Sequence, residues 1–272
     1  MYPPPIQKEA LPKILFDKIH RIHNLATQQQ TSTGNSALSH LTNLFEAYQY
    51  VYYVALVDYY LQRRDQEKED KERTGIIVDW GGFVGQVTIL LRSLGYDCEN
   101  NVLTFPSTKD AFDEFNIPYT INKNPKILPY KDNSVSALLS SGVLEHVHEY
   151  EMTDEEALQE IYRVLKPGGY FFCWNLPKKY ALLELLALQH KNSCHPIRYH
   201  QSQFSKKLEN TGFQVIDINS NSGILSIGGV RKVLQLFDPW KQFVFDYYVS
   251  QLPGIQFLAH HITAVAQKPT SK

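Results

Sequence analysis

The strongest constraint on the fold is a short apolar segment that ends in an acid and continues into a glycine-rich turn. Residues 76–79 have the character of a buried strand, residues 80–85 contain three glycines, and residues 86–94 have the pattern of a helix. Such a turn lets a ligand approach bare backbone at a helix N-terminus. Asp79 ends the strand where it would repel a bound diphosphate and attract a cationic ligand. Turns of this kind are common in α/β proteins, so the turn alone is weak evidence for a ligand site. The segments that follow it strengthen that interpretation.

Three downstream segments support the interpretation of the turn as part of a ligand-binding α/β domain. Residues 128–141 form a polar turn that leads into a buried strand, and Gly-Val-Leu-Glu-His-Val (142–147) follows that strand's carboxyl end. Residues 160–172 contain a helix that Pro-Gly-Gly ends before another apolar strand. Together they resemble the class I S-adenosylmethionine-dependent methyltransferases, in particular the small-molecule, type 11-like group with the signatures "LPF-x-D-x-S-F-D", "LEH" and "RVLKPGG". The resemblance covers about residues 75–218, with a final strand near 260–268.

The alternation of strands and helices after Gly75 predicts an α/β fold with a doubly wound, Rossmann-like sheet. The resemblance implies seven strands, the last of which is antiparallel and inserts between the fifth and the sixth. The expected strands are 76–79, about 98–105, 119–121, 135–140, 169–174, 213–218 and 261–268. The expected helices in this domain are 84–94, 107–115, 154–165, 179–190 and 201–211. Ligands of such sheets bind beyond the carboxyl ends of the strands.

Two additions accompany the expected catalytic domain at 75–272. Residues 1–74 read as a helical extension, because apolar positions recur every three or four residues from Leu41 to Tyr59 and form one face of an amphipathic helix. The tyrosine-rich stretch 48–60 either packs on the core or lines a substrate pocket. An insertion at about 224–260 is rich in aromatic residues, and it is either a substrate lid, a helix packed on the core or a homodimer contact.

The resemblance implies S-adenosylmethionine as the cofactor. Asp79 and the amides of the glycine turn would hold its methionyl part, Asn124 would meet the adenine, and backbone groups after the fourth strand would complete the site. The proposed cofactor-binding residues are Asp79, Gly81, Gly82, Gly85, Thr104, Asn124, Ser141 and Gly142. Thr104 is the spacing-based choice for the ribose, whereas charge favours Glu99. Phe83 departs from the family, whose members have a third small residue at the centre of the turn.

His146 is the candidate catalytic residue, because it follows the fourth strand and a neutral imidazole can accept a proton from a hydroxyl at physiological pH. A structural role beside the cofactor is the alternative. Glu145 is expected on a helix surface. No metal site is expected, because adjacent Cys194 and His195 cannot easily reach one ion.

The overall composition fits a small-molecule enzyme. The net charge of −1 gives no indication of a nucleic-acid partner, and no segment is apolar over a membrane-spanning length. Three widely spaced cysteines and a start without a signal peptide predict free thiols in the cytoplasm. The expected reaction is methyl transfer to a small-molecule, natural-product or sugar acceptor, with oxygen as the accepting atom. An inactive methyltransferase-like scaffold subunit is the alternative, while Asp79 argues against an NAD-dependent oxidoreductase.

Overall fold

The computed structural model contains the predicted seven-stranded α/β sheet, with the strand order β3-β2-β1-β4-β5-β7-β6. The described residues are 7–33, 38–66, 75–103, 113–181, 197–221, 237–252, 254, 256 and 259–270. The strands are β1 Ile77–Trp80, β2 Cys98–Val102, β3 Tyr119–Ile121, β4 Val135–Ser141, β5 Leu165–Pro177, β6 Gln214–Asn221 and β7 His261–Gln267. The chain divides into two compact units, Met1–Ile121 with Pro239–Phe243, and Asn122–Asp238 with Val244–Lys272.

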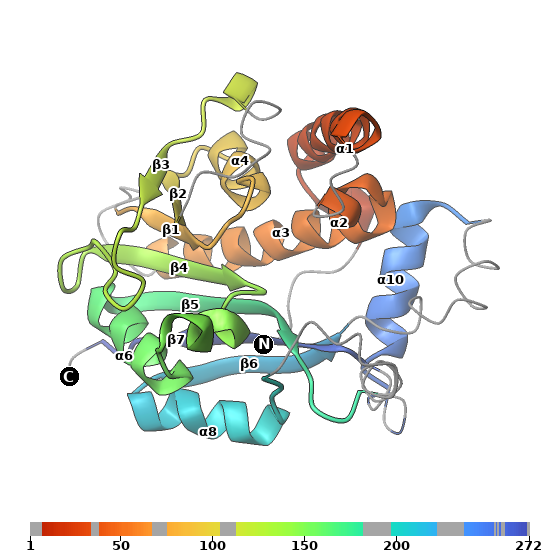
Figure 1. Cartoon of the computed structure of the whole chain (residues 1–272). Helices are drawn as coiled ribbons and strands as arrows, with labels where there is room; N and C mark the ends of the chain where they lie inside the picture. Colours follow the sequence, from red (N-terminus) through yellow and green to blue (C-terminus); the bar gives the residue numbers. More distant parts are fainter. Residues whose placement is uncertain are drawn as a thin grey trace. The chain divides into compact units, whose positions relative to one another are not determined.

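The first unit joins the N-terminal helices to three parallel strands (Figure 1). Its helices are η1 Lys8–Ala10, α1 Lys13–Thr33, α2 Ser39–Thr42, α3 Leu44–Gln66, α4 Gln86–Ser93 and η3 Asp113–Phe115. In the register of the strands, Asp79 pairs with Asn100, and Asn100 pairs with Tyr119. All four residues of β1 are buried. The register therefore places polar side chains of neighbouring strands beside Asp79 of β1.

The tyrosine-rich part of α3 is packed on all sides. Residues 50–57 are buried without interruption, because α1, α2 and α4 all contact α3. The buried tyrosines of this stretch are Tyr48, Tyr50, Tyr52, Tyr53 and Tyr60. The expectation of a single buried face was therefore wrong for the middle of this helix, and the burial supports the packing alternative for its aromatic residues.

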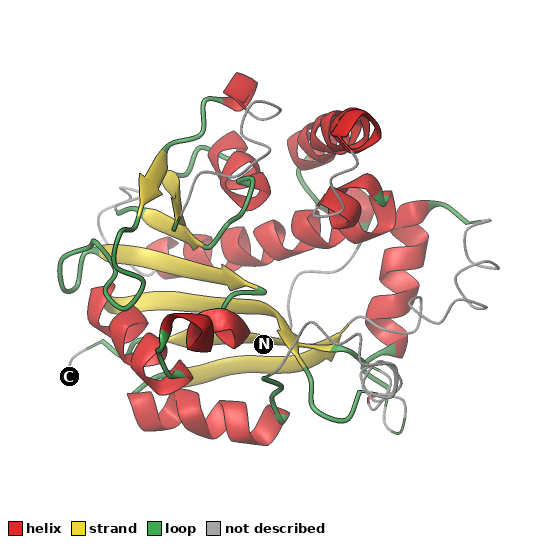
Figure 2. Ribbon diagram, in the orientation of Figure 1, coloured by secondary structure: helices red, strands yellow, loops and turns green. Residues whose placement is uncertain are grey.

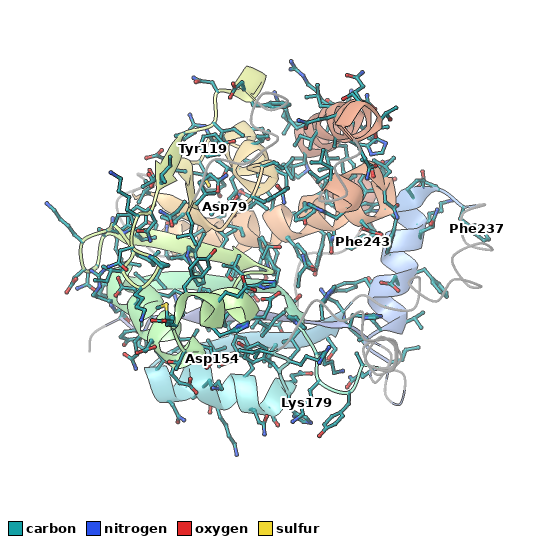
Figure 3. All side chains as sticks on the ribbon, viewed as in Figure 1. Asp79, Tyr119, Asp154, Lys179, Phe237 and Phe243 are labelled. Atoms are coloured by element: carbon teal, nitrogen blue, oxygen red, sulfur yellow. The ribbon has the colours of Figure 1, made fainter. Side chains whose placement is uncertain are left out.

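The start of α10 (Pro239–Val249) belongs to the same aromatic core. The Trp240 ring lies edge-on to Phe16 and Tyr48, with ring centroids 5.1 and 5.6 Å apart, and the Phe243 ring lies 5.7 Å from Tyr52. Figure 3 labels Phe243 on α10. For these two residues the contacts support packing on the core. The lid and the homodimer contact stay predictions, and residues 224–236 of the expected insertion lie outside the described residues.

The second unit contains the antiparallel end of the sheet. Strands β4 and β5 are parallel, whereas β7 runs antiparallel to both β5 and β6, as the resemblance implied. Its helices are η4 Leu144–Tyr150, α6 Asp154–Val164 and α8 Gln201–Thr211, and the last two contact each other (Figure 2). A capping box of Thr153 and Glu156 begins α6. Lys207 of α8 binds Asp154 at 3.0 Å and fixes α8 against that helix start.

Several element boundaries differ from the expectation. Strand β5 begins at Leu165, four residues early, because Leu165 pairs with Val135 of β4. The strand continues through the Pro-Gly-Gly turn, where Gly168 N donates to Lys268 O at 2.7 Å and Lys268 N donates to Gly169 O at 2.9 Å. Most of the expected helices 107–115 and 179–190 lies outside the described residues. Within the described part of the chain, no helix is long and apolar enough to span a membrane.

Candidate functional site

The glycine turn after β1 has the backbone that the sequence predicted. Gly81 and Gly85 have φ angles of 67° and 83°, in the left-handed region that favours glycine. Gly82 is required for a different reason, because a Cβ atom there would lie 2.3 Å from Asp79 Oδ2 and 2.5 Å from Asn100 Oδ1. The turn thus brings backbone directly against the side chains of β1 and β2.

Asp79 lies at the base of this turn and also caps the next helix (Figure 3). Its Oδ2 accepts hydrogen bonds from Thr88 N at 3.2 Å and from Thr88 Oγ1 at 2.9 Å. Thr88 is in the first turn of α4, whose N-cap residue Gly85 has no side chain to serve that amide. Burial raises the pKa of the Asp79 carboxyl to about 6, and the two bonds from Thr88 oppose that rise.

The second carboxylate oxygen of Asp79 differs from the first in its hydrogen bonding. Among the described residues Asp79 Oδ1 has no hydrogen-bond partner, and neither has Asn100 Oδ1, although both atoms are buried. Leaving a buried acceptor unsatisfied costs on the order of 1–3 kcal/mol. Two such acceptors, one of them on a carboxylate, suit a ligand that brings hydrogen-bond donors and positive charge.

Asn100 is a candidate site residue that was not predicted from the sequence. The candidates predicted in and after the second strand were Glu99 and Thr104, whereas the amide in the middle of β2 is the group beside Asp79. Two consecutive asparagines in an otherwise buried strand, Asn100 and Asn101, were the signal available. Of the two ribose candidates, Thr104 lies outside the described residues, and Glu99 accepts a hydrogen bond from Thr120 Oγ1 at 2.8 Å on β3.

Phe83 occupies the central position of the turn without disrupting it. Its φ of 46° is the left-handed conformation, which costs a non-glycine residue roughly 1–2 kcal/mol. Its amide donates to Gly81 O at 2.7 Å, and its carbonyl accepts from Asn100 Nδ2 at 3.4 Å. The departure from the family pattern is therefore accommodated by strained backbone.

In the second unit, the ends of β4 and β5 hold the remaining candidates. Gly142 N donates to Trp174 O at 3.0 Å, and Asn175 Nδ2 donates to Ser141 Oγ at 3.0 Å. Asn124 is exposed, and its side-chain oxygen already accepts from Lys126 N at 3.0 Å. Ser141 and Gly142 are thus fixed at a strand end, while Asn124 sits in a turn of its own.

Glu145 is buried rather than on a helix surface, so that expectation was wrong. Residues 144–150 form a 3-10 helix that turns Leu144, Glu145 and Val147 inward, and Glu145 is 1% exposed. Burial raises the pKa of its carboxyl to about 7, and a hydrogen bond from its own backbone and the neighbouring His146 oppose the rise. His146 is partly exposed, with Nε2 4.0 Å from Glu145 Oε1 and Nδ1 2.7 Å from Glu149 Oε1. The imidazole therefore lies between two carboxyl groups.

The described residues contain no group of three or more histidine, cysteine or acidic side chains that could hold a metal ion. Cys194 and His195, the weak metal candidates, lie outside that part of the chain. The two described cysteines, Cys98 and Cys173, are free and buried.

Comparison with known proteins identifies the domain. The family model described as "Methyltransferase domain" matches residues 78–173. A similar solved structure is the complex between the Haloferax volcanii Trm112 methyltransferase activator and the putative methyltransferase, with 18% identity over 78% of this chain and 90% of that chain and a TM-score of 0.51. A SAM-dependent methyltransferase from Archaeoglobus fulgidus follows at 16% identity over 79% of this chain and 94% of that chain, with a TM-score of 0.49.

A search of curated protein sequences found no match. The family match spans the glycine turn, the η4 segment and most of β5 up to Cys173, and the first solved structure has the same fold. Residues 78–173 of this chain therefore form a methyltransferase domain.

Proposed function

We propose that the enzyme binds S-adenosylmethionine on its glycine turn and transfers the methyl group to a hydroxyl oxygen of a small molecule, such as a natural product or a sugar. The observation that carries this proposal is the pair of buried acceptors, Asp79 Oδ1 and Asn100 Oδ1, beside a turn whose Gly82 leaves no room for a side chain. The methionyl ammonium of the cofactor supplies the donors and the positive charge that these acceptors need. Its carboxylate suits the amide of Gly82 and the N-terminus of α4. The amides of Gly81 and Gly85 donate to Asn101 O and Gly82 O at 2.7 Å each, so these two residues would shape the turn around the ligand.

The other proposed contacts follow from the groups that each residue presents. Ser141 and Gly142 would offer groups at the end of β4, and Asn124 would offer its NH₂ group to the adenine, since its oxygen is engaged by Lys126. Thr104 or Glu99 would bind the ribose. Each of these residues can be substituted separately, and each substitution should weaken cofactor binding without loss of the fold.

For the acceptor, His146 is the proposed base. Bound S-adenosylmethionine supplies a sulfonium methyl that is already electrophilic, so positioning provides much of the rate. His146 would take the hydroxyl proton as the oxygen–carbon bond forms and the carbon–sulfur bond breaks. Glu149, at 2.7 Å from Nδ1, fixes the ring and leaves Nε2 to act. Buried Glu145 would stabilise the imidazolium that results.

The proposal also places the enzyme in the cytoplasm, which the free thiols of Cys98 and Cys173 support. Its partner is the acceptor molecule, and a net charge of −1 supports a ligand other than nucleic acid. An inactive scaffold remains the competing function. It would bind the cofactor without forming S-adenosylhomocysteine from any acceptor.

A matched pair of glycine variants tests the binding site. Gly82→Ala places a methyl group 2.3 Å from Asp79 Oδ2, whereas Gly254→Ala strains a backbone with φ of 81° and meets no atom within 4 Å. Calorimetric titration with S-adenosylhomocysteine should show at least about tenfold weaker binding for Gly82→Ala and unchanged binding for Gly254→Ala. Equal binding by both variants would remove the glycine turn from the site.

The choice of oxygen is tested by turnover. Matched acceptors that differ only in carrying a hydroxyl or an amine should give S-adenosylhomocysteine from the hydroxyl compounds. Product from the amines alone would replace oxygen with nitrogen as the accepting atom.

A further inference from the structure

Phe83 stands out among the described residues that have a positive φ without being glycine. Three of the six are asparagine, which tolerates the left-handed conformation, whereas Phe83 and Tyr180 are aromatic. Phe83 lies inside the cofactor turn, between Gly81 and Gly85. Strain of this kind persists only where the surroundings hold the residue in place, so the contacts of Phe83 need an explanation.

The ring of Phe83 meets the N-terminal helices. Its centroid lies 6.2 Å from the ring of His40 on α2, and His40 lies 6.0 Å from the ring of Tyr50 on α3. Tyr50 is 5% exposed and packs edge-on against Tyr53 at 6.4 Å. An aromatic chain therefore runs from the glycine turn into the core of α3.

Helix α3 also reaches the residue that follows the turn. Gln86, the first residue of α4, lies beside the Tyr50 hydroxyl and lowers its pKa, while burial raises that pKa well above its ordinary value. The N-terminal helices thus meet Phe83 of the turn through His40 of α2, and α3 lies beside Gln86 directly after the turn.

The backbone of Phe83 acts on the ligand-facing acceptors. Its carbonyl accepts from Asn100 Nδ2, and this bond directs Asn100 Oδ1 toward the space above Gly82, where Asp79 also lies. If the Phe83 backbone moved, the Asn100 amide would lose the partner that orients it. Phe83 therefore links the ring contact with His40 to the position of Asn100 Oδ1, one of the two buried acceptors.

We propose that Phe83 is a positioning residue for the cofactor, and that the N-terminal helices α2 and α3 are part of the cofactor site because they hold Phe83 through His40 and Tyr50. This inference rests on the proposed binding of S-adenosylmethionine at the turn. In place of a flexible glycine, the chain uses an aromatic residue whose conformation depends on helices that precede the catalytic domain in sequence.

The test compares two aromatic residues that share the left-handed backbone. Phe83→Gly relieves strain but removes the ring contact with His40, whereas Tyr180→Gly relieves the same kind of strain at a side chain that is 59% exposed. Calorimetric titration of the full chain with S-adenosylhomocysteine should give binding weakened at least about tenfold in Phe83→Gly, and binding within about twofold of wild type in Tyr180→Gly.

Further variants separate positioning from general stability. Phe83→Tyr should retain the affinity, because the ring stays. His40→Ala should weaken binding as Phe83→Gly does, and the double variant should be no weaker than Phe83→Gly alone, since both changes break one coupling. His40→Ala also provides the test if Phe83→Gly does not fold.

Three results would overturn the inference. Wild-type affinity in Phe83→Gly or in His40→Ala would show that the ring contact does not position the turn, whatever happens to the melting temperature. Additive losses in the double variant would show that the two residues act separately. A wild-type chain that binds no S-adenosylhomocysteine would remove both this inference and the proposed function, whereas normal wild-type binding with unaffected variants would remove the inference alone.

Discussion

Two buried carboxyl groups, one in each compact unit, are held in contrasting ways. Asp79 and Glu145 are both 1% exposed, and burial raises the pKa of Asp79 to about 6 and that of Glu145 to about 7. Two hydrogen bonds from Thr88 oppose the rise in the pKa of Asp79, whereas the rise in the pKa of Glu145 is opposed first by a hydrogen bond from its own backbone and then by His146, a group that can itself change its charge. The first arrangement suits a binding group with constant geometry, and the second suits a group that responds when a proton moves.

The largest effect expected from this contrast concerns stability. The folded-state pKa of Asp79 lies above its ordinary value of 3.8, so stability from this group is complete below pH 3.8 and is lost as pH rises through about 6. Asp79→Asn removes the buried charge and should raise the free energy of unfolding at pH 8 by up to about 3 kcal/mol. Denaturant unfolding at pH 8 checks this. A destabilised Asp79→Asn at pH 8 would show that the ionised carboxylate is stabilised by groups not accounted for.

The second prediction concerns catalysis in the other unit. His146→Ala should lower turnover by about a hundredfold, as expected for loss of a general base, and leave the affinity for S-adenosylhomocysteine nearly unchanged. Glu145→Gln should lower turnover by about tenfold, because the neutral amide no longer stabilises the charged imidazole. Glu209→Gln, an exposed acid on α8, is the control. Weaker cofactor binding with an unchanged rate would make His146 a scaffold residue.

The third and smallest effect concerns the pH dependence of binding. A cationic ligand binds the ionised form of Asp79, so the affinity should be constant above about pH 6 and fall about tenfold for each pH unit below it. Titrations between pH 5 and 8 measure this. Glu145→Gln should leave the profile unchanged, while a flat profile in the wild type would contradict the role of Asp79.

The regular elements of the fold were predictable because their patterns are local. Strand β3 and helix α8 have the predicted bounds, and β7 has the antiparallel direction that the resemblance implied. Strand β5 was predicted too short, since its added residues pair with Val135 of β4 and with Lys268, about a hundred residues away. The periodicity of a sequence reports local structure and does not identify a pairing partner that is distant in the chain.

The site was predictable only in part. The acid and glycines of the turn form a contiguous pattern, so Asp79 and Gly82 could be proposed from the sequence. Asn100 was missed because a buried amide within a strand has no periodic signature, and Glu145 was misplaced because a 3-10 helix and an α-helix bury different faces of the same residues. The conformation of Phe83 depends on tertiary contacts with α2.

In the proposed site, Asp79 provides the charge that binds the cofactor, so the decisive experiment is calorimetric titration of the wild type and Asp79→Asn with S-adenosylhomocysteine at pH 8. We expect saturable binding at one site in the wild type and at least about a hundredfold weaker binding in Asp79→Asn, while the variant stays folded. Equal affinity in the two proteins, or no binding by the wild type, would contradict it.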